Sequence, residues 1–360
     1  MKWSFRLFRV GGVGIYVHVT FFLLLIWVGV ENFLVEHRWE DAVAGIIFIL
    51  ALFTIVVLHE FGHAMMARRF GVQTRDITLL PIGGVARLDR MPEDPKQELA
   101  IAIAGPAVNV LLAVLFFSVL AMQNQLAATH QFVGAGNHFL WNLVRINVVL
   151  AVFNLLPAFP MDGGRVLRAL LATRMNYVRA TNIAANVGQA MAFVFGIAGL
   201  FVNPLLVLVA VFVWMGAAQE AGAVQMRSNL TDVPVSRLMI TDFHTLAPDE
   251  PLSRAVDQLL AAYQQDFPVV DNGKMVGLLT RPRLVDGLAQ LGSDAEVSRV
   301  MDREFPSVQP TEPAETAFLK LQQTHSRALP VLREGGLLGI LTSEHIGEFL
   351  MVRAALNGSA

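Results

Sequence analysis

Two histidines and a glutamate stand close together inside a long apolar stretch of the sequence. They form the pattern His59-Glu60-x-x-His63 within an apolar run at residues 43–67. Residues four apart on a helix share one face, so the two imidazoles can bind one metal ion, and Glu60 can take a proton from an attacking water. Burying an ionisable group inside a membrane costs free energy, so three such groups together favour a functional site over simple packing. The competing interpretation is a set of hydrogen-bonded polar residues between packed helices.

A catalytic zinc site needs a third protein ligand and an open fourth position. The sequence has no cysteine, so a histidine or a carboxylate must supply that ligand. Asp162 is the only carboxylate between residues 99 and 219, and it ends the segment Asn154-Leu-Leu-Pro-Ala-Phe-Pro-Met-Asp162, whose prolines can turn the chain toward the metal. We therefore expect Asp162 to be the third ligand. The alternative is a helix cap, because Asp before a glycine pair is also ordinary turn chemistry.

Composition places the chain in a membrane. Hydrophobic residues make up 54% and charged residues 16% of the 360 residues, whereas about a quarter of a soluble domain is charged. Six apolar stretches approach the roughly 20 residues that a bilayer requires, and they lie at about 16–35, 43–67, 99–122, 139–157, 181–201 and 203–222. The net charge of −2 gives no indication of a nucleic-acid partner.

The basic residues predict the orientation in the membrane. Lys and Arg gather before the first apolar stretch and after the second and fourth, and none lies between residues 123 and 138. By the positive-inside rule, both termini then lie in the cytoplasm. We expect an integral membrane protein of a bacterial or archaeal cell membrane.

Beyond about residue 230 the sequence becomes a soluble α/β pattern that contains an internal repeat. Three short segments recur 62 residues later, and they are 235–239 with 297–301, 267–270 with 329–332, and 276–280 with 338–342. Each copy reads as helix, strand, strand, helix. The expected fold is a polytopic α-helical membrane protein with about six transmembrane helices and a C-terminal α/β repeat domain. The expected limits are 1–225 for the membrane domain, 226–234 for a linker, and 235–290 and 297–352 for the repeats.

The two polar motifs of the membrane part resemble those of the site-2 proteases, a family of intramembrane zinc metalloproteases. That family carries His-Glu-x-x-His in one span and Asn-x-x-Pro-x-x-Pro-x-Asp-Gly in a later one, and this chain matches both. The resemblance implies that His59, His63 and Asp162 bind one zinc ion per chain. It also implies that Glu60 is the general base and that Asn154 holds the substrate or the oxyanion.

The resemblance extends to Gly83 and Gly84 after the second span, and to Ala-Gly-Pro-x-x-Asn ending at Asn109. Residues 79–86 are apolar around the glycine pair. They predict either a membrane-dipping hairpin, whose edge strand would bind an unwound substrate by strand addition, or an ordinary loop. Small residues before Asn109 let helices approach closely, so this amide is expected to hydrogen-bond across a helix interface, mainly in a packing role.

The repeat resembles a tandem pair of CBS domains, which often binds adenine nucleotides between its copies and tunes an attached protein. In the nucleotide-binding pattern a Thr is followed three residues later by an Asp. Here Arg283 follows Thr280 and His345 follows Thr342, so both aspartates are missing. Three alternatives stay open, namely an adenine nucleotide, a role in dimerisation or substrate docking, and a scaffold without a ligand. We expect a homodimer through the CBS pair.

Together these features predict an intramembrane zinc metalloprotease. It would hydrolyse a peptide bond in or near a transmembrane segment of a membrane protein, in regulated intramembrane proteolysis modulated by a cytoplasmic CBS pair. The alternative is a CBS-regulated membrane ion transporter that uses the intramembrane histidines and aspartate as an ion path. A general base beside a pair of metal ligands has no use in ion transport, which favours the protease.

Overall fold

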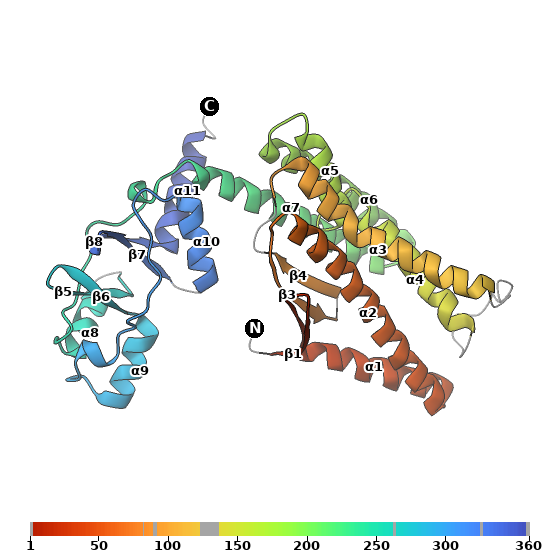
Figure 1. The fold of residues 1–360 in the computed structure, drawn as a ribbon, viewed down its shortest axis with the longest axis horizontal. Coiled ribbons are helices and arrows are strands. Elements are labelled where there is room, and N and C mark those ends of the chain that lie inside the picture. The colour runs from red at the N-terminus through yellow and green to blue at the C-terminus, as the bar shows by residue number, and fades with distance from the viewer. Residues whose placement is uncertain are drawn as a thin grey trace. The chain divides into compact units, whose positions relative to one another are not determined.

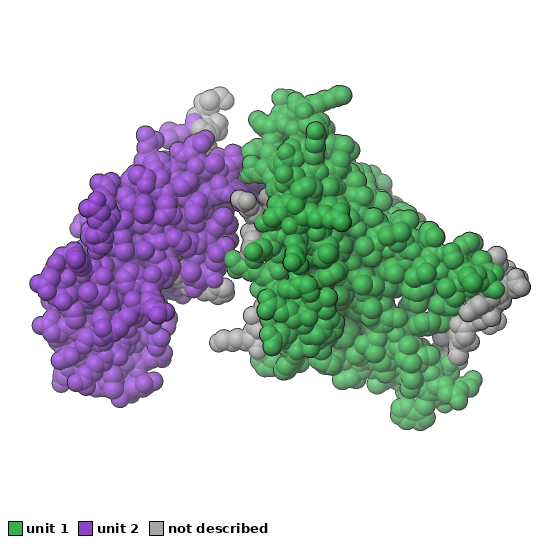
Figure 2. Space-filling view, in the orientation of Figure 1, with its two compact units in different colours: residues 1–222 green, residues 223–360 purple. Residues whose placement is uncertain are grey.

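The computed structural model describes residues 3–81, 83–88, 92–122, 137–261, 264–324 and 327–357. The chain divides into two compact units, residues 1–222 and 223–360, which Figure 1 draws as a ribbon and Figure 2 colours separately. The first unit holds both polar motifs of the membrane part. The second unit holds the internal repeat.

The first unit is built mainly from apolar helices. They are α1 (Val19–Glu36), α2 (Trp39–Arg69), α3 (Pro95–Met122), α4 (Asn137–Asn154), α5 (Asp162–Ala172), α6 (Tyr177–Phe201) and α7 (Leu205–Thr231), the last of which continues into the second unit. Within the described residues, α2, α3, α6 and α7 are long and apolar enough to cross a membrane, while α1 and α4 contain shorter apolar segments. Each of the six predicted stretches therefore contains an apolar helix, which confirms the polytopic helical class.

The first predicted span begins later than expected, because a strand takes its start. Residues 16–18 belong to β2 (Val13–His18), and α1 begins only at Val19, where His18 caps the helix by accepting a hydrogen bond from the backbone N–H of Thr20. β2 is rich in β-branched residues and mostly buried. Such residues fit a pleated, half-buried surface, and this preference overrides the apolar run at that point.

A four-stranded sheet accompanies the helices of the first unit, and sequence reasoning predicted only its last hairpin. Its order is β1-β2-β3-β4, with β1 (Ser4–Val10), β3 (Thr74–Leu80) and β4 (Gly83–Leu88) joining β2. β2 and β3 pair parallel, and the other two pairs are antiparallel. The predicted hairpin at residues 79–86 is thus present as β3 and β4, and β4 lies at an edge of the sheet.

Glycines allow the close approaches that place the metal-site helices together. A Cβ added to Gly62 on α2 would lie 2.8 Å from the carbonyl oxygen of Ala104 on α3. One added to Gly163 would lie 2.2 Å from the carbonyl oxygen of Leu156, so the segment between α4 and α5 folds back on the first turn of α5. Side chains at these positions would force the elements apart.

The second unit contains two copies of one helix–strand–strand–helix order. The first copy has α8 (Leu252–Ala261), β5 (Phe267–Asp271), β6 (Lys274–Leu279) and α9 (Arg281–Leu291), after a short 3₁₀ turn at Val235–Arg237. The second has a 3₁₀ turn at Val297–Arg299, then α10 (Ala314–Thr324), β7 (Ala328–Arg333), β8 (Gly336–Thr342) and α11 (Ser343–Asn357). The copies share a core, because Val235 and Leu238 from before α8 pack with Val331 and Leu341 of the second copy.

Candidate functional site

Two histidines of α2 and one aspartate of α5 converge in the interior of the first unit. The Nε2 atoms of His59 and His63 lie 3.1 Å apart. Oδ2 of Asp162 lies 3.2 Å from Nε2 of His59 and 3.1 Å from Nε2 of His63. All three side chains are buried. Residues 99 positions apart in the sequence thus present one nitrogen or oxygen each to the same point.

The carboxylate of Asp162 does not cap its own helix. α5 begins with Asp162 as its first helical residue, and Met161 occupies the cap position without a side-chain hydrogen bond to the helix. The oxygen of Asp162 faces the imidazoles instead.

Both imidazoles are oriented by hydrogen bonds from their far nitrogens. Nδ1 of His63 donates to the backbone carbonyl oxygen of Ile101 at 2.7 Å, and Nδ1 of His59 donates to Oδ1 of Asn109 at 2.5 Å. A carbonyl oxygen can only accept, so the proton of each neutral ring sits on Nδ1 and the lone pair of Nε2 points at the shared position. The amide of Asn109 also donates to Asn147 of α4, so the expected hydrogen bond across a helix interface is confirmed.

Gly105 of α3 leaves the space in front of the two Nε2 atoms open. A Cβ added to this residue would lie 2.2 Å from Nε2 of His63 and 2.7 Å from Nε2 of His59. A glycine therefore faces the point where the donors converge. Two imidazole nitrogens, one carboxylate oxygen and a cradle that a methyl group would fill suit a zinc ion.

Sequence reasoning missed how far α3 supports this site. Ile101, Gly105 and Asn109 follow at spacings of four, which places them on one face of the helix. The signal that could have found Asn109 is its polar amide within an apolar span, for which the sequence favours a packing role.

The remaining predicted residues lie at different places around the site. β4 passes close to α2, because a Cβ added to Gly84 would lie 3.0 Å from Cγ of Glu60 and 2.9 Å from Cγ1 of Val56. Gly83 begins β4 with a φ of +137°, which a residue with a side chain adopts only under strain. Asn154 is half-buried at the end of α4. Its contact with a substrate stays a prediction.

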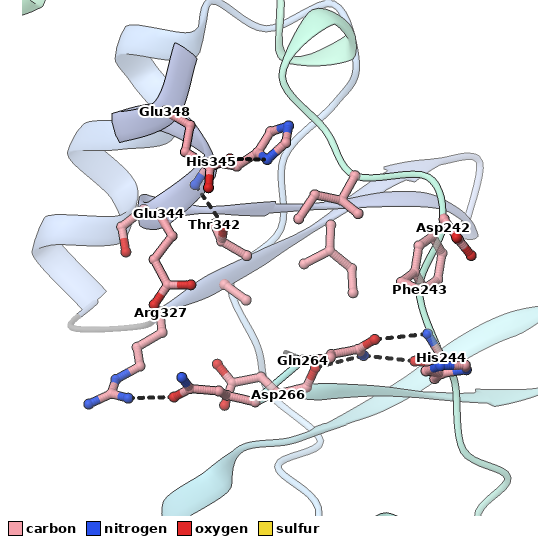
Figure 3. A pocket seen from close by; sticks show the side chains of 15 residues that line it. Asp242, Phe243, His244, Gln264, Asp266, Arg327, Thr342, Glu344, His345 and Glu348 are labelled. Atoms are coloured by element: carbon pink, nitrogen blue, oxygen red, sulfur yellow. Dashed lines mark hydrogen bonds and ion pairs between the residues drawn. The ribbon is translucent and has the colours of Figure 1, made fainter. Parts of the chain in front are cut away.

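The second unit contains a pocket of about 460 Å³, which Figure 3 shows from close by. Both copies of the repeat line it, the first with Asp242, His244 and Asp266 and the second with Arg327, Thr342 and His345 among others. The backbone N–H of His345 donates to Oγ1 of Thr342, and its ring lies 3.3 Å from a carboxylate oxygen of Glu348. The position where the nucleotide pattern has Asp thus carries a histidine beside a glutamate.

Two polar side chains that line this pocket are held by the protein itself. Gln264 bonds both the backbone N–H and the carbonyl oxygen of His244, each at 2.8 Å. Burial raises the pKa of Asp266 above its ordinary value, while the backbone N–H of Arg281 and the charge of Arg327 act in the opposite direction. In the first copy, Arg283 forms an ion pair with Asp302 at 2.8 Å.

Both units match known protein families in sequence. The sequence profile of peptidase family M50 matches residues 47–195, and the CBS domain profile matches residues 235–290 and 297–351. Zinc metalloprotease MJ0392 of Methanocaldococcus jannaschii is 37% identical over 284 residues, which cover 78% of each chain. The chain belongs to peptidase family M50.

Two further comparisons describe this M50 chain. Stage IV sporulation protein FB of Bacillus subtilis is 30% identical over 158 residues, covering 44% of this chain and 51% of the relative. A solved structure, the site-2 protease from Methanocaldococcus jannaschii, is 40% identical, covers 61% of this chain and 95% of the other, and has a TM-score of 0.45.

The M50 chain is an intramembrane zinc metalloprotease with an attached CBS pair. It is an integral membrane protein, and its substrates are membrane proteins in the bilayer. The resemblance to site-2 proteases is confirmed, and the protease is favoured over the alternative of a CBS-regulated ion transporter.

Proposed function

We propose that His59, His63 and Asp162 hold the catalytic zinc ion and that Glu60 is the general base of peptide-bond hydrolysis inside the membrane. The observation that carries this assignment is the convergence of the three buried donors, within 3.1 to 3.2 Å of one another, at a point that Gly105 keeps open. These three residues would hold a zinc ion there, and the ion would supply Lewis-acid chemistry to polarise the scissile carbonyl and activate the attacking water.

Other residues near the donors transfer the proton, bind the oxyanion and orient the imidazoles. Glu60 follows the first histidine directly, so its carboxylate takes the proton of the water and passes it to the leaving amine. Asn154, at the end of α4, donates a hydrogen bond to the oxyanion that develops on the substrate carbonyl. Asn109 and the carbonyl oxygen of Ile101 keep the imidazoles in the tautomer that binds metal.

The general-base assignment is tested with Glu60→Gln. The amide keeps the size of the side chain but cannot accept the proton, so cleavage of a co-expressed membrane substrate should fall by at least about 10²-fold. Zinc content and expression should stay at wild-type level, because Glu60 is not among the three donors. Membrane proteomics of cells with wild type and variant then identifies the substrate as the protein that accumulates uncut. Undiminished cleavage would contradict the assignment.

We further propose that the substrate adds as an extended strand to the edge of β4, at Gly83 and Gly84. A peptide bond inside a helix is protected by its own hydrogen bonds, whereas an edge strand offers unpaired backbone groups to an unwound segment. The closeness of Gly84 to Glu60, whose Cγ atom would lie 3.0 Å from a Cβ added to Gly84, supports this position, because the added strand would run beside the general base.

Cysteine cross-linking tests the added strand, since the chain has no native cysteine. Val85→Cys, at an exposed position of β4, is combined with Glu60→Gln and with single cysteines along a substrate. Cross-linking should alternate with a period of two residues, as in a strand. Met122→Cys, at an exposed position of α3, is the control and should not cross-link. A period of 3.6 residues would show a helical substrate and contradict the proposal.

We propose that both termini lie in the cytoplasm of a bacterial or archaeal cell, with the CBS pair on that side. The alternation of basic connections supports this orientation. A membrane-impermeant thiol reagent applied to intact cells should fail to label a single cysteine placed at Gly273, in the turn between β5 and β6, until the cells are opened.

We propose that the pocket of the CBS pair is a regulatory ligand site. Its volume falls in the range of about 300–1,000 Å³ that is common for small-molecule sites. An adenine nucleotide is the ligand that CBS resemblance implies, and the replacement of the ribose-binding aspartates by Arg283 and His345 reduces its expected affinity. The regulated substrate would be a membrane-anchored signalling protein.

We also propose a homodimer through the CBS pair. Several large apolar side chains of this unit are exposed, among them Leu260, Leu291, Met351 and Leu356. Sedimentation of the full chain in detergent should give the mass of two chains, and Met351→Glu should shift it toward one.

A further inference from the structure

A cluster of charged side chains is buried in the first unit, away from the three metal donors. Arg168 of α5 and Glu98 of α3 are 1% and 0% exposed. Oε1 of Glu98 lies 2.5 Å from Nη2 and 2.7 Å from Nε of Arg168. Nη1 of Arg168 lies 2.6 Å from Oε1 of Glu220 on α7. One guanidinium group thus joins three helices.

Two aromatic rings lie close to the guanidinium group of Arg168, in addition to its carboxylate partners. The guanidinium carbon lies 5.0 Å from the ring centre of Phe159 and 4.8 Å from that of Tyr177. Within the described residues, the second oxygen of Glu98 has no hydrogen-bond partner. A buried ion pair gives little net stability compared with apolar residues of the same size. Its presence is better explained by the fixed relative position that it imposes on its helices.

The cluster is joined to the metal site through α3. Glu98 lies three residues before Ile101 and seven before Gly105, so it shares the helix face that orients His63 and leaves room for the metal. Arg168 lies six residues after Asp162, about 9 Å along the axis of α5. The Arg168–Glu98 pair therefore fixes the helix that carries Asp162 against the helix that carries the supports of the histidines.

Glu220 adds a connection to the helix that leads into the CBS pair. α7 continues from Leu205 to Thr231. Near its end, Arg227 forms an ion pair with Glu315, and Leu230 is fully buried in the core of the second unit. α7 thus carries Glu220 in the first unit and Arg227 and Leu230 in the second.

We propose that Arg168 is a positioning residue of the metal centre. By pairing with Glu98 and Glu220 it holds α5 in the place where the carboxylate of Asp162 meets the two imidazoles. This inference rests on the proposed role of Asp162 as a metal ligand. Loss of the guanidinium removes the ion pairs that tie α5 to α3 and α7, so the oxygen ligand moves relative to the nitrogens and the metal is bound more weakly.

The test uses the full chain in detergent, stripped of metal and titrated with Co²⁺, whose visible absorption reports the coordination geometry. Arg168→Met removes the charge but keeps an apolar side chain of similar length. We expect a loss of about 10- to 100-fold in Co²⁺ affinity and an altered spectrum of the bound ion, the range found when groups that orient metal ligands are replaced. Arg168→Lys should restore part of both, because it returns the charge without the bidentate fork.

The matched control is Arg174→Met, an exposed arginine just after α5, which should bind Co²⁺ with wild-type affinity and spectrum. Asp162→Ala is the reference for loss of the ligand. If Asp162→Ala binds metal like wild type, the proposed ligand is wrong and the positioning role falls with it. If Asp162→Ala fails to bind while a folded Arg168→Met matches wild type, the positioning role alone is overturned.

Glu220→Gln decides the case in which Arg168→Met does not fold. The side chain of Glu220 is 33% exposed, so the neutral amide is tolerated, and Arg168 keeps its pair with Glu98. We expect a several-fold weaker Co²⁺ affinity and an altered spectrum of the bound ion. A wild-type affinity and spectrum in Glu220→Gln would then overturn the proposal.

Discussion

The metal site in the membrane unit and the pocket in the CBS pair differ in how their polar groups are used. At the metal site, each far nitrogen of the histidines has one partner, and the near atoms point together at a common position. In the CBS pocket, polar side chains are paired within the protein, Gln264 with the backbone of His244 and His345 with the side chain of Glu348. The donors of the metal site are already oriented toward one metal ion. The polar groups of the CBS pocket do not indicate one class of bound molecule, which must be found by experiment.

This difference follows from the surroundings of the two sites. An ionisable group inside a membrane is costly, so those that are kept there serve a purpose that the sequence alone can indicate. In a unit that faces water, polar groups cost little free energy, so their presence says less about function. The same reasoning from sequence was therefore specific for His59, His63 and Asp162 and left three alternatives for the repeat.

The largest effect we expect in a direct comparison of the sites is that of Gly105→Ala. The added methyl group would lie 2.2 Å from Nε2 of His63, so the ring must move from its position. A misplacement of about 1 Å at a catalytic group costs about 10²-fold in rate, and we expect that loss in kcat/KM, with weaker zinc binding. The measurement is cleavage of a reconstituted substrate together with zinc content.

Gly196→Ala on α6 is the control, because its Cβ would meet only Ala210 at an ordinary distance of 3.6 Å. It should retain wild-type activity. Full activity and zinc content in Gly105→Ala would show that the donors do not converge as described.

A tenfold effect is expected in the CBS pocket from His345→Asp. This change restores the Thr-x-x-Asp pattern after Thr342. A carboxylate that accepts hydrogen bonds from ribose hydroxyls adds about 1.4 kcal/mol of binding free energy, which is tenfold in affinity. Calorimetric titration of the full chain with ATP, ADP and AMP measures it.

The first copy of the repeat supplies the matched comparison. Arg283→Asp at the equivalent position breaks the ion pair with Asp302 and puts two carboxylates together, so it should bring no gain in nucleotide affinity. Equal gains at both positions, or none at His345, would contradict the assignment of the pocket to an adenine nucleotide.

The smallest effect concerns the stability of the CBS pair and its dependence on pH. The pKa of Asp266 is raised in the folded protein by burial, so its contribution to stability is present below the unfolded pKa of about 3.9 and is lost as pH rises through the folded value. Asp266→Asn keeps the acceptor for the backbone N–H of Arg281 and removes the charge. At pH 7 it should stabilise the unit by on the order of 0.5 kcal/mol.

Pulse proteolysis of the full chain in urea measures this difference. At about pH 3, below the unfolded pKa of Asp, the carboxyl is protonated in both the folded and the unfolded protein, so the advantage of Asp266→Asn should vanish. An advantage that is equal at both pH values would show that the charge of Asp266 is not the cause.

The parts of the molecule that could be predicted from sequence are those with long apolar runs, a regular repeat, or an ionisable residue within an apolar span. Apolar length predicted the helices, the offset of 62 residues predicted the two-copy unit, and the isolated carboxylate at Asp162 predicted which distant residue meets the histidines. The hairpin at residues 79–86 was one of two interpretations. The strand at Val13–His18 was missed, because an apolar run that leads into a helix hides the alternation of a short strand.

Sequence reasoning did not assign Ile101, Gly105 or Arg168 to the metal site, for a physical reason. Ile101 acts through its backbone carbonyl oxygen and Gly105 through the absence of a side chain, so neither carries a chemical signal in its residue type. Arg168 and Glu98 lie 70 positions apart, and only the packing of α3 against α5 shows that they pair.

The central claim is that two imidazoles and one carboxylate bind a single zinc ion within the membrane unit. X-ray absorption at the zinc edge, together with metal analysis of the purified full chain, tests it most directly. The account predicts one zinc ion per chain with two imidazole nitrogens and oxygen ligands, and the loss of that ion in Asp162→Ala. Metal far below one ion per chain in an active preparation, or a bound zinc ion without histidine ligands, would contradict it.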